Sequence, residues 1–266
     1  LFQAEITVST LNRRSTSADP KTFGISEYEP VLPIYHSGQP EDSKKHCSDL
    51  LHRLDRIDPD RLSPENAYTY RLLHCSLEND LALADFPYYN EPLSPSSGMQ
   101  SQLPVLLAEY TFRTKRDVTD YLALLDQIDD YFASLLLYEQ EKAAAGFFMP
   151  ACSSEKVRKQ CDTIVTIEEL AQGTHFLQTT FEDRLSELQK QGLFTPEETA
   201  SLIETNDRLL ATVVQPAYAA LSEGLHSLET STNADSTASE TTANAASGKN
   251  NSVHNGLPKG LALLPD

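Results

Sequence analysis

The sequence predicts an all-α fold, arranged as an extended array of long amphipathic helices. Apolar residues recur at i, i+3 and i+4 in every segment that has a clear pattern. Residues that start helices, such as serine or threonine followed by proline, stand where these patterns begin. Hydrophobic residues make up 39% of the 266-residue chain, which is enough to form a core.

Residues 1–43 are expected to form a short N-terminal helix and then an irregular segment that wraps over the helical body. The amphipathic pattern covers residues 2–12. Prolines then recur too often for a long helix, at Pro20, Pro30, Pro33 and Pro40.

The helical body is expected over residues 44–229 and begins with two helices. Residues 44–57 predict a short helix with one buried face, made of Cys47, Leu50, Leu51, Leu54 and Ile57. Ser63 is a predicted N-cap, because Pro64 follows it at the first helical position. The apolar stripe of this second helix comprises Tyr70, Leu73, Leu77, Leu81 and Ala84.

A single helix about 45 Å long is predicted over residues 116–145, where Gly146 ends it. Its inward side chains are Val118, Tyr121, Leu122, Leu125, Ile128, Phe132, Leu135 and Leu136, and its outward ones are Asp120, Gln127, Asp130 and Ser134. This helix should act as the spine of the array.

Three further helices complete the predicted body. One follows Ser153 and runs to about Gly173, and the next carries a stripe of Phe176, Phe181, Leu185 and Leu188. The third begins at Thr195 with a capping box that includes Glu198, and Pro216 should bend it before it ends near Leu228.

The composition changes after Glu229. Residues 230–256 consist almost entirely of small polar and acidic residues, so we expect a mobile low-complexity insertion. Apolar residues return at 257–266, which we interpret as the start of a following region. Because the chain also begins without Met, we expect a longer parent protein.

The formal net charge of −18 makes nucleic acid a poor candidate partner, since phosphates would be repelled. No window approaches the roughly 20 apolar residues of a transmembrane segment, and the N-terminus lacks the pattern of a signal peptide. Cys152 and Cys161 could be bridged only if the chain folds back between them, so free thiols are the simpler interpretation.

No complete catalytic or metal site is expected in this chain, and alone it should be inactive and bind no zinc. The common signatures of metalloproteases, serine hydrolases and nucleotide-binding loops are absent from the sequence. His74 and Glu78 share a helix face, but a zinc site needs three or four converging ligands. The adjacent pairs Asp129-Asp130 and Glu168-Glu169 diverge on a helix and are interpreted as solvated.

The best binding candidate is the aromatic, proline-rich loop that precedes Gln102. It should be ordered, and aromatic loops on rigid helices often line clefts. Tyr88, Tyr89, Gly98 and Gln102 are the candidate substrate-binding residues. A purely structural role for the loop, which would pin it to the core, stays open.

Several short motifs follow one another in a characteristic order. They are residues 18–25 (ADPKTFGI), 96–104 (SSGMQSQLP), 117–125 (DVTDYLALL), 146–150 (GFFMP), 157–161 (VRKQC), 216–218 (PAY) and 260–266 (GLALLPD). Together they resemble the bacterial family catalogued as domain of unknown function 885. The resemblance covers nearly the whole chain except the low-complexity insertion.

This resemblance implies a long helical protein, often an exported lipoprotein of Gram-positive bacteria, that looks like a zinc metallopeptidase. In such proteins a His-Glu motif followed closely by Pro-Gly-His holds the zinc, C-terminal to the region seen here. This sequence contains no such motif, so no catalytic or metal-binding residue is carried over onto it. The chain would then be the N-terminal part of a larger metallopeptidase-like fold.

Two functions follow. In the first, the chain forms one wall of a peptide cleft, and its partner is the C-terminal catalytic portion of the same protein. The resemblance also implies an extracytoplasmic location, with a lipid anchor at the cell surface and the signal segment removed. In the alternative, the chain is a non-enzymatic cell-surface module that binds a peptide or a protein partner. The residues that follow Asp266 would discriminate between them, because only the first function requires zinc ligands there.

Overall fold

A computed structural model of the chain describes residues 9–11, 24–25 and 28–244, with side chains described as far as residue 231. All regular secondary structure in this part of the chain is helical, which confirms the predicted all-α class. The described residues divide into two compact units, one of residues 35–91 and one that comprises residues 92–244 with the described residues between 9 and 34. The boundaries at residues 43, 229 and 256 that the sequence suggests stay predictions.

The first unit is a helical hairpin of α3 (Gln39–Leu54) and α4 (Pro64–Leu83), joined through the short 3₁₀ helix η2 (Pro59–Arg61). The predicted N-cap of α4 is confirmed, because the Ser63 hydroxyl accepts a hydrogen bond from the Asn66 N–H at 3.3 Å. The predicted stripe of α4 is also its less exposed side, with Leu77 buried.

The prediction for α3 needs two corrections. α3 begins earlier than expected, at Gln39, because Pro40 occupies its first turn, where the missing N–H costs nothing. Its apolar face packs on α4 and is only half-buried, and Ile57 lies beyond the helix with 42% of its surface exposed. This unit therefore has little core of its own.

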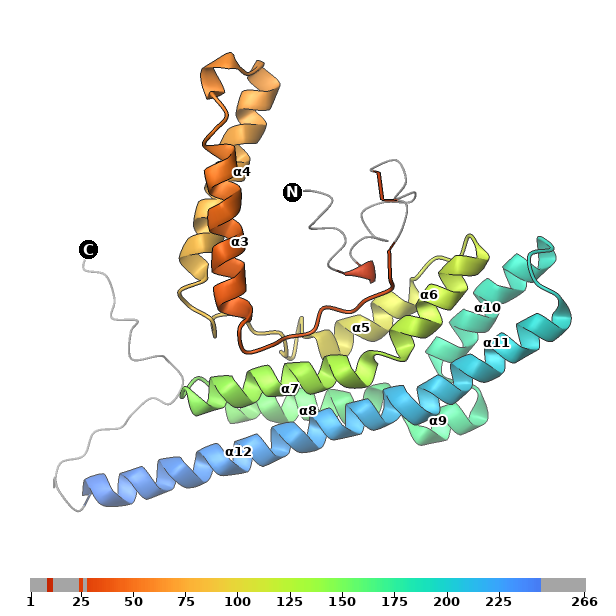
Figure 1. Ribbon diagram of the computed structural model, residues 1–266. Coiled ribbons are helices and arrows are strands. Elements are labelled where there is room, and N and C mark those ends of the chain that lie inside the picture. Colours follow the sequence, from red (N-terminus) through yellow and green to blue (C-terminus); the bar gives the residue numbers. More distant parts are fainter. Residues whose placement is uncertain (1–8, 12–23, 26–27, 245–266) are drawn as a thin grey trace. The chain divides into compact units, whose positions relative to one another are not determined.

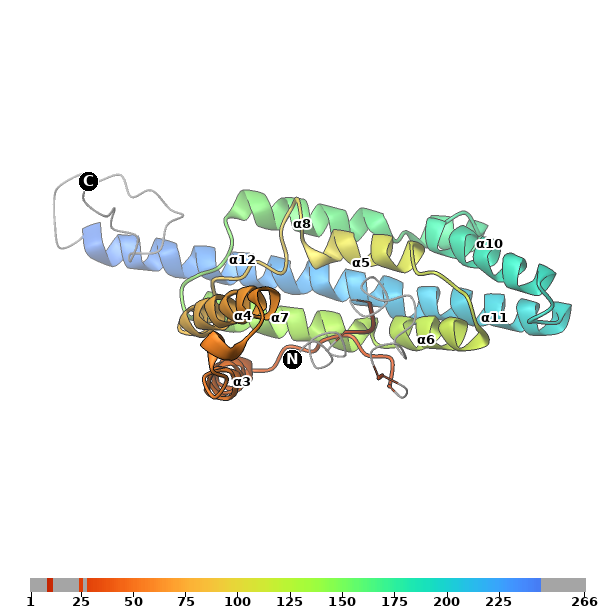
Figure 2. The same cartoon turned by 90° about the horizontal axis from the view of Figure 1, so that it is seen from above.

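The second unit holds the main core. Its helices are α5 (Met99–Ala108), α6 (Lys115–Leu125), α7 (Ile128–Ala144), α8 (Ala151–Ile164), α9 (Ile167–Gln172), α10 (Phe176–Lys190), α11 (Pro196–Leu209) and α12 (Gln215–Asn244). A turn of π-helix, η3 (Leu210–Val214), joins α11 to α12 in one rod (Figure 1). α12 packs on both α7 and α8, and α11 packs on α6 and α10 (Figure 2).

The prediction of one spine helix over residues 116–145 is wrong in one respect. The structure has two helices there, with a break at Asp126 and Gln127. The Gln127 amide donates to the carbonyls of Ala123 and Pro30, both at 2.9 Å, and its oxygen accepts from the Leu32 N–H at 3.1 Å. The side chain therefore caps α6 and holds the N-terminal segment against it. The predicted end is confirmed, since Gly146 has φ +85° directly after α7.

Two side chains predicted to point outward from this spine are buried. Asp120 is 4% exposed and accepts a hydrogen bond from the Tyr28 hydroxyl at 2.8 Å. Ser134 is 6% exposed and donates to the Tyr131 carbonyl at 2.7 Å. Both are satisfied by hydrogen bonds, which makes their burial tolerable.

The helix predicted to run to Gly173 is also broken, into α8 and α9. Thr166 starts α9 as its N-cap, and Gly173 ends it in the left-handed conformation. His175 caps backbone groups at this junction, because Nε2 lies 2.8 Å from the Ile164 carbonyl oxygen and Nδ1 accepts from the Leu177 N–H at 3.3 Å. One buried imidazole thus joins the end of α8 to the start of α10.

The capping box at Thr195 is confirmed in both directions. Thr195 accepts from the Glu198 N–H at 3.2 Å, and Glu198 accepts from the Thr195 N–H at 2.8 Å. The rod that starts here continues past Leu228 to Asn244 in α12. The rest of the predicted insertion, residues 245–256, lies outside the described residues, and so does the region 257–266. Of the helix expected over residues 2–12, only residues 9–11 are described.

Candidate binding groove

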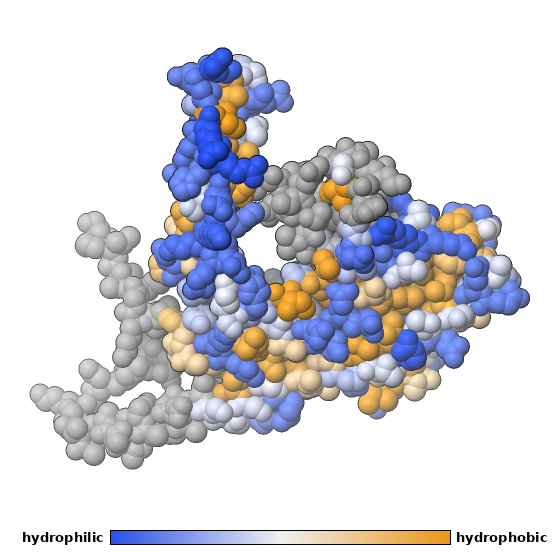
Figure 3. Space-filling model, in the orientation of Figure 1, coloured by the Kyte–Doolittle hydropathy of each residue, from blue (hydrophilic) through white to orange (hydrophobic). Residues whose placement is uncertain are grey.

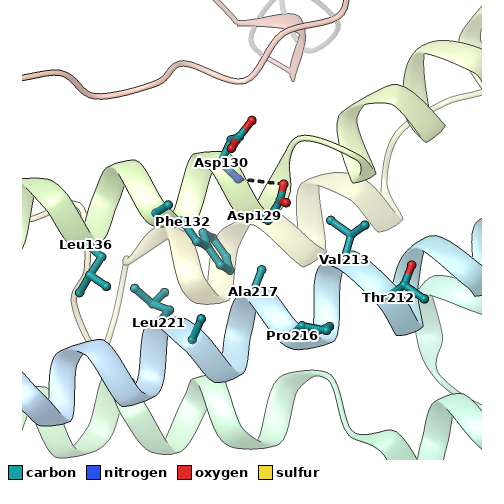
Figure 4. A pocket seen from close by; sticks show the side chains of 11 residues that line it. Asp129, Asp130, Phe132, Leu136, Thr212, Val213, Pro216, Ala217 and Leu221 are labelled. Carbon is teal, nitrogen blue, oxygen red and sulfur yellow. Dashed lines mark hydrogen bonds between the residues drawn. The ribbon is translucent and has the colours of Figure 1, made fainter.

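The second unit has a groove between α7 and the junction of η3 with α12. Its volume is about 410 Å³. Phe132 and Leu136 face it from α7, and Val213, Ala217 and Leu221 face it from the η3–α12 side (Figure 4). The floor is thus apolar, as in most small-ligand and peptide sites.

The π-helical turn determines the η3 side of the groove. The Gln215 N–H bonds the Leu210 carbonyl, one residue further back than in an α-helix. Pro216 has no N–H to give to the Thr212 carbonyl, so the regular α-helical bond is impossible at this point. Thr212 and Pro216 both line the groove. Turns of this kind are frequent at functional sites.

Two carboxylates form the acidic rim of the groove. Asp129 and Asp130 lie in the first turn of α7, where the helix dipole favours negative charge. The Asp130 N–H donates to Asp129 Oδ1 at 2.8 Å, and both residues are exposed (Figure 4). Their exposure agrees with the solvated interpretation. Sequence reasoning nevertheless missed the groove, and its one local signal was the proline inside a helical pattern.

The candidate residues Tyr88 and Tyr89 belong to the first unit. Tyr88 is half-buried and lines a second hollow, of about 400 Å³, whose other walls include Tyr35, Lys44 and Asp85. Tyr89 is 73% exposed. An exposed tyrosine beside a lined hollow is compatible with binding, and the role of both residues stays a prediction.

The candidate residues Gly98 and Gln102 belong to the second unit, at the start of α5. The Gln102 N–H donates to the Gly98 carbonyl at 3.1 Å, and its exposed side chain donates to the Ser97 carbonyl at 2.8 Å. Gly98 is buried, and a Cβ added there would lie 2.3 Å from the Ser94 nitrogen. Gly98 therefore has a structural reason to be glycine, whether or not the loop binds a ligand.

The histidine pair considered for a metal does not have the geometry of a zinc site. His74 Nδ1 lies 3.3 Å from Glu78 Oε2, and Nε2 lies 3.2 Å from Asp55 Oδ1. The two carboxylates contact different nitrogens of one ring, so the three side chains do not converge on a point. Within the described ranges, no three His, Cys, Asp or Glu side chains are grouped to hold a metal ion.

None of the four cysteines, which all lie within the described residues, forms a disulfide. Cys161 is buried and Cys152 is exposed, although α8 carries both. Burial raises the pKa of the Cys161 thiol to about 12. The possible bridge between these two residues is therefore not formed.

Comparison with known proteins places the chain in a family. The sequence profile of the family described as "Bacterial protein of unknown function (DUF885)" matches residues 21–252. The chain belongs to the DUF885 family. None of the curated proteins matches it. No helix among the described residues of this DUF885 protein is long and apolar enough to cross a membrane.

The fold of this DUF885 chain is similar to that of a solved structure. It is the crystal structure of a protein from Colwellia psychrerythraea named "putative lipoprotein", with a TM-score of 0.64 and 17% sequence identity. The match covers 85% of this chain and 40% of the Colwellia chain. This chain thus spans less than half the length of that protein, and the likeness concerns the fold alone.

Proposed function

We propose that this DUF885 chain is the N-terminal helical portion of an exported zinc metallopeptidase-like protein, in which it forms one wall of a peptide cleft. Catalysis and zinc binding belong to a C-terminal portion in this proposal. Family membership supports it, and so does a fold match that covers only 40% of the longer Colwellia chain. The proposed location is extracytoplasmic, with a lipid anchor.

The groove between α7 and η3–α12 is the observation that carries the peptide-binding part. Its floor suits the apolar side chains of a peptide. The carboxylates of Asp129 and Asp130 suit a lysine or arginine side chain. These two features together favour a peptide with apolar and basic residues.

Binding to synthetic peptides tests this assignment. A peptide of alternating leucine and lysine should bind, and a leucine–glutamate peptide of equal length should not, as measured by isothermal titration calorimetry. Ala220→Phe should abolish binding, because Ala220 is exposed and lines the groove. Ala219→Phe is the matched control, since Ala219 is an exposed neighbour on α12 that does not line it. Equal binding by both variants would remove the groove from the proposal.

The alternative function is a non-enzymatic module that binds a peptide or protein partner. In that case the groove would bind its ligand without a catalytic portion. Ala220→Phe in the parent protein separates the two. If the groove is part of a catalytic cleft, the variant should lose both peptide binding and peptide turnover. If the variant loses binding but keeps its turnover, the groove belongs to a non-enzymatic module.

A further inference from the structure

Helix α4 has a second apolar stripe, on the side away from α3. It consists of Tyr68, Leu72, Cys75, Asn79 and Leu83, which follow one another in steps of three and four residues. The apolar members are unusually open to solvent, with exposures of 60% for Tyr68, 54% for Leu72 and 50% for Leu83. Cys75 and Asn79 are exposed too.

The stripe is narrow and straight. At roughly 100° per residue, its five members fall within about 80° of the helix circumference. The residues that pack toward α3, such as Leu73, Leu77 and Leu81, lie on the opposite side. Hydrophobic residues interrupt the hydrophilic surface along the α3–α4 hairpin (Figure 3). A soluble helix with apolar residues on two opposite faces normally packs against two partners.

We propose that α4 of a second copy of this chain covers the stripe, in an antiparallel pair whose two-fold axis passes beside Cys75. In that arrangement Tyr68 of one copy meets the partner's Leu83, and Leu72 meets the partner's Asn79. A two-fold interface uses the same patch on both subunits, and this stripe is arranged nearly symmetrically about Cys75.

Charge complementarity supports a second copy and specifies its direction. Arg71 and Glu78 flank the stripe on the same side of α4, one before and one after Cys75. An antiparallel copy brings Arg71 against the partner's Glu78, and the symmetry forms this opposite-charge pair twice. A parallel copy would place Arg71 and Glu78 at separate levels, without such pairs. Within its own copy, Glu78 also contacts His74.

Asn79 is the polar member of the stripe. Its Nδ2 lies 3.8 Å from Cys75 Sγ one turn earlier in the same helix, so the amide keeps this contact when the partner's Leu72 covers it. Leu77 is the one buried residue of α4, so the hairpin has little core of its own. Pairing with a second copy would bury more apolar surface and so stabilise the hairpin.

The first test measures the molar mass of the 266-residue chain under reducing conditions by sedimentation velocity over a range of concentrations. A concentration-dependent dimer is expected. Leu72→Asp should raise the dimer dissociation constant at least about tenfold, because it places a charge in the seam. Val105→Asp on α5, which is 51% exposed, is the matched control and should leave the dimer intact. Circular dichroism checks that each variant is folded.

The direction of pairing is tested by charge reversal and by oxidation. Arg71→Glu should weaken the dimer, and adding Glu78→Arg should restore it. Mild oxidation should link two copies through Cys75, so Cys75→Ser abolishes the linked dimer and Cys152→Ser, at the exposed thiol of α8, does not. A chain that stays monomeric at its highest soluble concentration overturns the proposal, as does a dimer that is indifferent to Leu72→Asp. Loss of the dimer in Arg71→Glu without rescue by Glu78→Arg overturns the antiparallel pairing.

Discussion

At the scale of single residues, Gly98 occupies a position that has no room for a side chain. A Cβ there would lie 2.0 Å from Gln100 Oε1 and 2.5 Å from the Ser94 carbonyl oxygen. Gln100 cannot easily move away, because its Nε2 donates to the Ser94 carbonyl at 2.7 Å and to Gln160 Oε1 at 2.8 Å. This contact is how the loop before α5 is fixed to α8.

Gly98→Ala should therefore destabilise the fold by about 1–3 kcal/mol, the usual cost of overpacking. Urea denaturation followed by circular dichroism measures it. Gly146→Ala is an informative comparison, because no atom lies within 4 Å of a Cβ there and the cost comes from its φ of +85° alone. If the Gly98→Ala variant is as stable as the unsubstituted chain, the described packing of this loop is incorrect.

Tyr89 is expected to behave in the opposite way. With 73% of its surface exposed, Tyr89→Ala should change the free energy of unfolding by less than about 0.5 kcal/mol. If the loop binds substrate, peptide turnover by the parent protein should fall. Tyr121→Ala is the buried control, since Tyr121 is fully enclosed and should cost about 3–5 kcal/mol. A large loss of stability in Tyr89→Ala would contradict a binding role.

At the scale of elements, the separation of α6 from α7 depends on Gln127. Its amide contacts the carbonyls of Ala123 and Pro30 and the N–H of Leu32. Gln127→Ala removes these bonds together and should cost about 1–3 kcal/mol, because partly buried backbone groups lose their partner. Gln102→Ala, at an exposed residue with one bond to the Ser97 carbonyl, should cost much less. Equal costs measured by thermal unfolding would show that Gln127 does not hold the break.

Helix starts were predictable because they are local. Ser63 and Thr195 are recognised from the three residues that follow each of them. The break at Gln127 was not predictable, because the apolar pattern continues across it and its cause lies in residues 30 and 32. The burial of Asp120 has the same origin, since its partner Tyr28 is remote in sequence. Local chemistry thus sets helix starts, while tertiary contacts set the breaks and the buried polar residues.

At the scale of the whole molecule, the division into two units and the groove both escaped prediction. The groove requires a π-helical turn to pack beside α7, and the sequence shows only the proline. The aromatic loop was recognised from composition, but its tyrosines and its glycine belong to different units. Composition located a candidate segment and could not assign its residues to a common surface.

The buried tyrosine hydroxyls and the buried thiol of the second unit predict how the free energy of unfolding depends on pH. Burial raises the pKa of Tyr121, Tyr131 and Cys161 to about 12 each, above the values of about 8.5–10 in an unfolded chain. The folded state holds these protons more tightly than the unfolded chain does. The three groups therefore contribute fully to the free energy of unfolding below a pH of about 8.5, and this contribution is lost as the pH rises toward about 12.

Urea midpoints measured between neutral pH and a pH of about 11.5 should therefore fall steadily above a pH of about 9. Tyr131→Phe removes one ionising group, so the slope of this decline should be smaller in that variant. Tyr89→Phe, at an exposed tyrosine, is the control and should keep the original slope. A flat profile across the alkaline range would contradict the burial of these hydroxyls and of the thiol.

The π-helical turn η3 has a consequence for how the rod tolerates changes in length. Its wide turn holds one residue more than an α-helical turn, so it sets the rotational phase of α12 relative to α11. Deleting Ala211 would remove this extra residue, so the turn would close to an α-helical one and Leu221 and Leu225 would keep their places against α7 and α8. Deleting one residue from the regular part of α12 before Leu221 would instead rotate Leu221 and Leu225 by roughly 100° about the axis and turn them away from α7 and α8. A single missing codon at η3 should therefore be less harmful than one a few residues further along the rod.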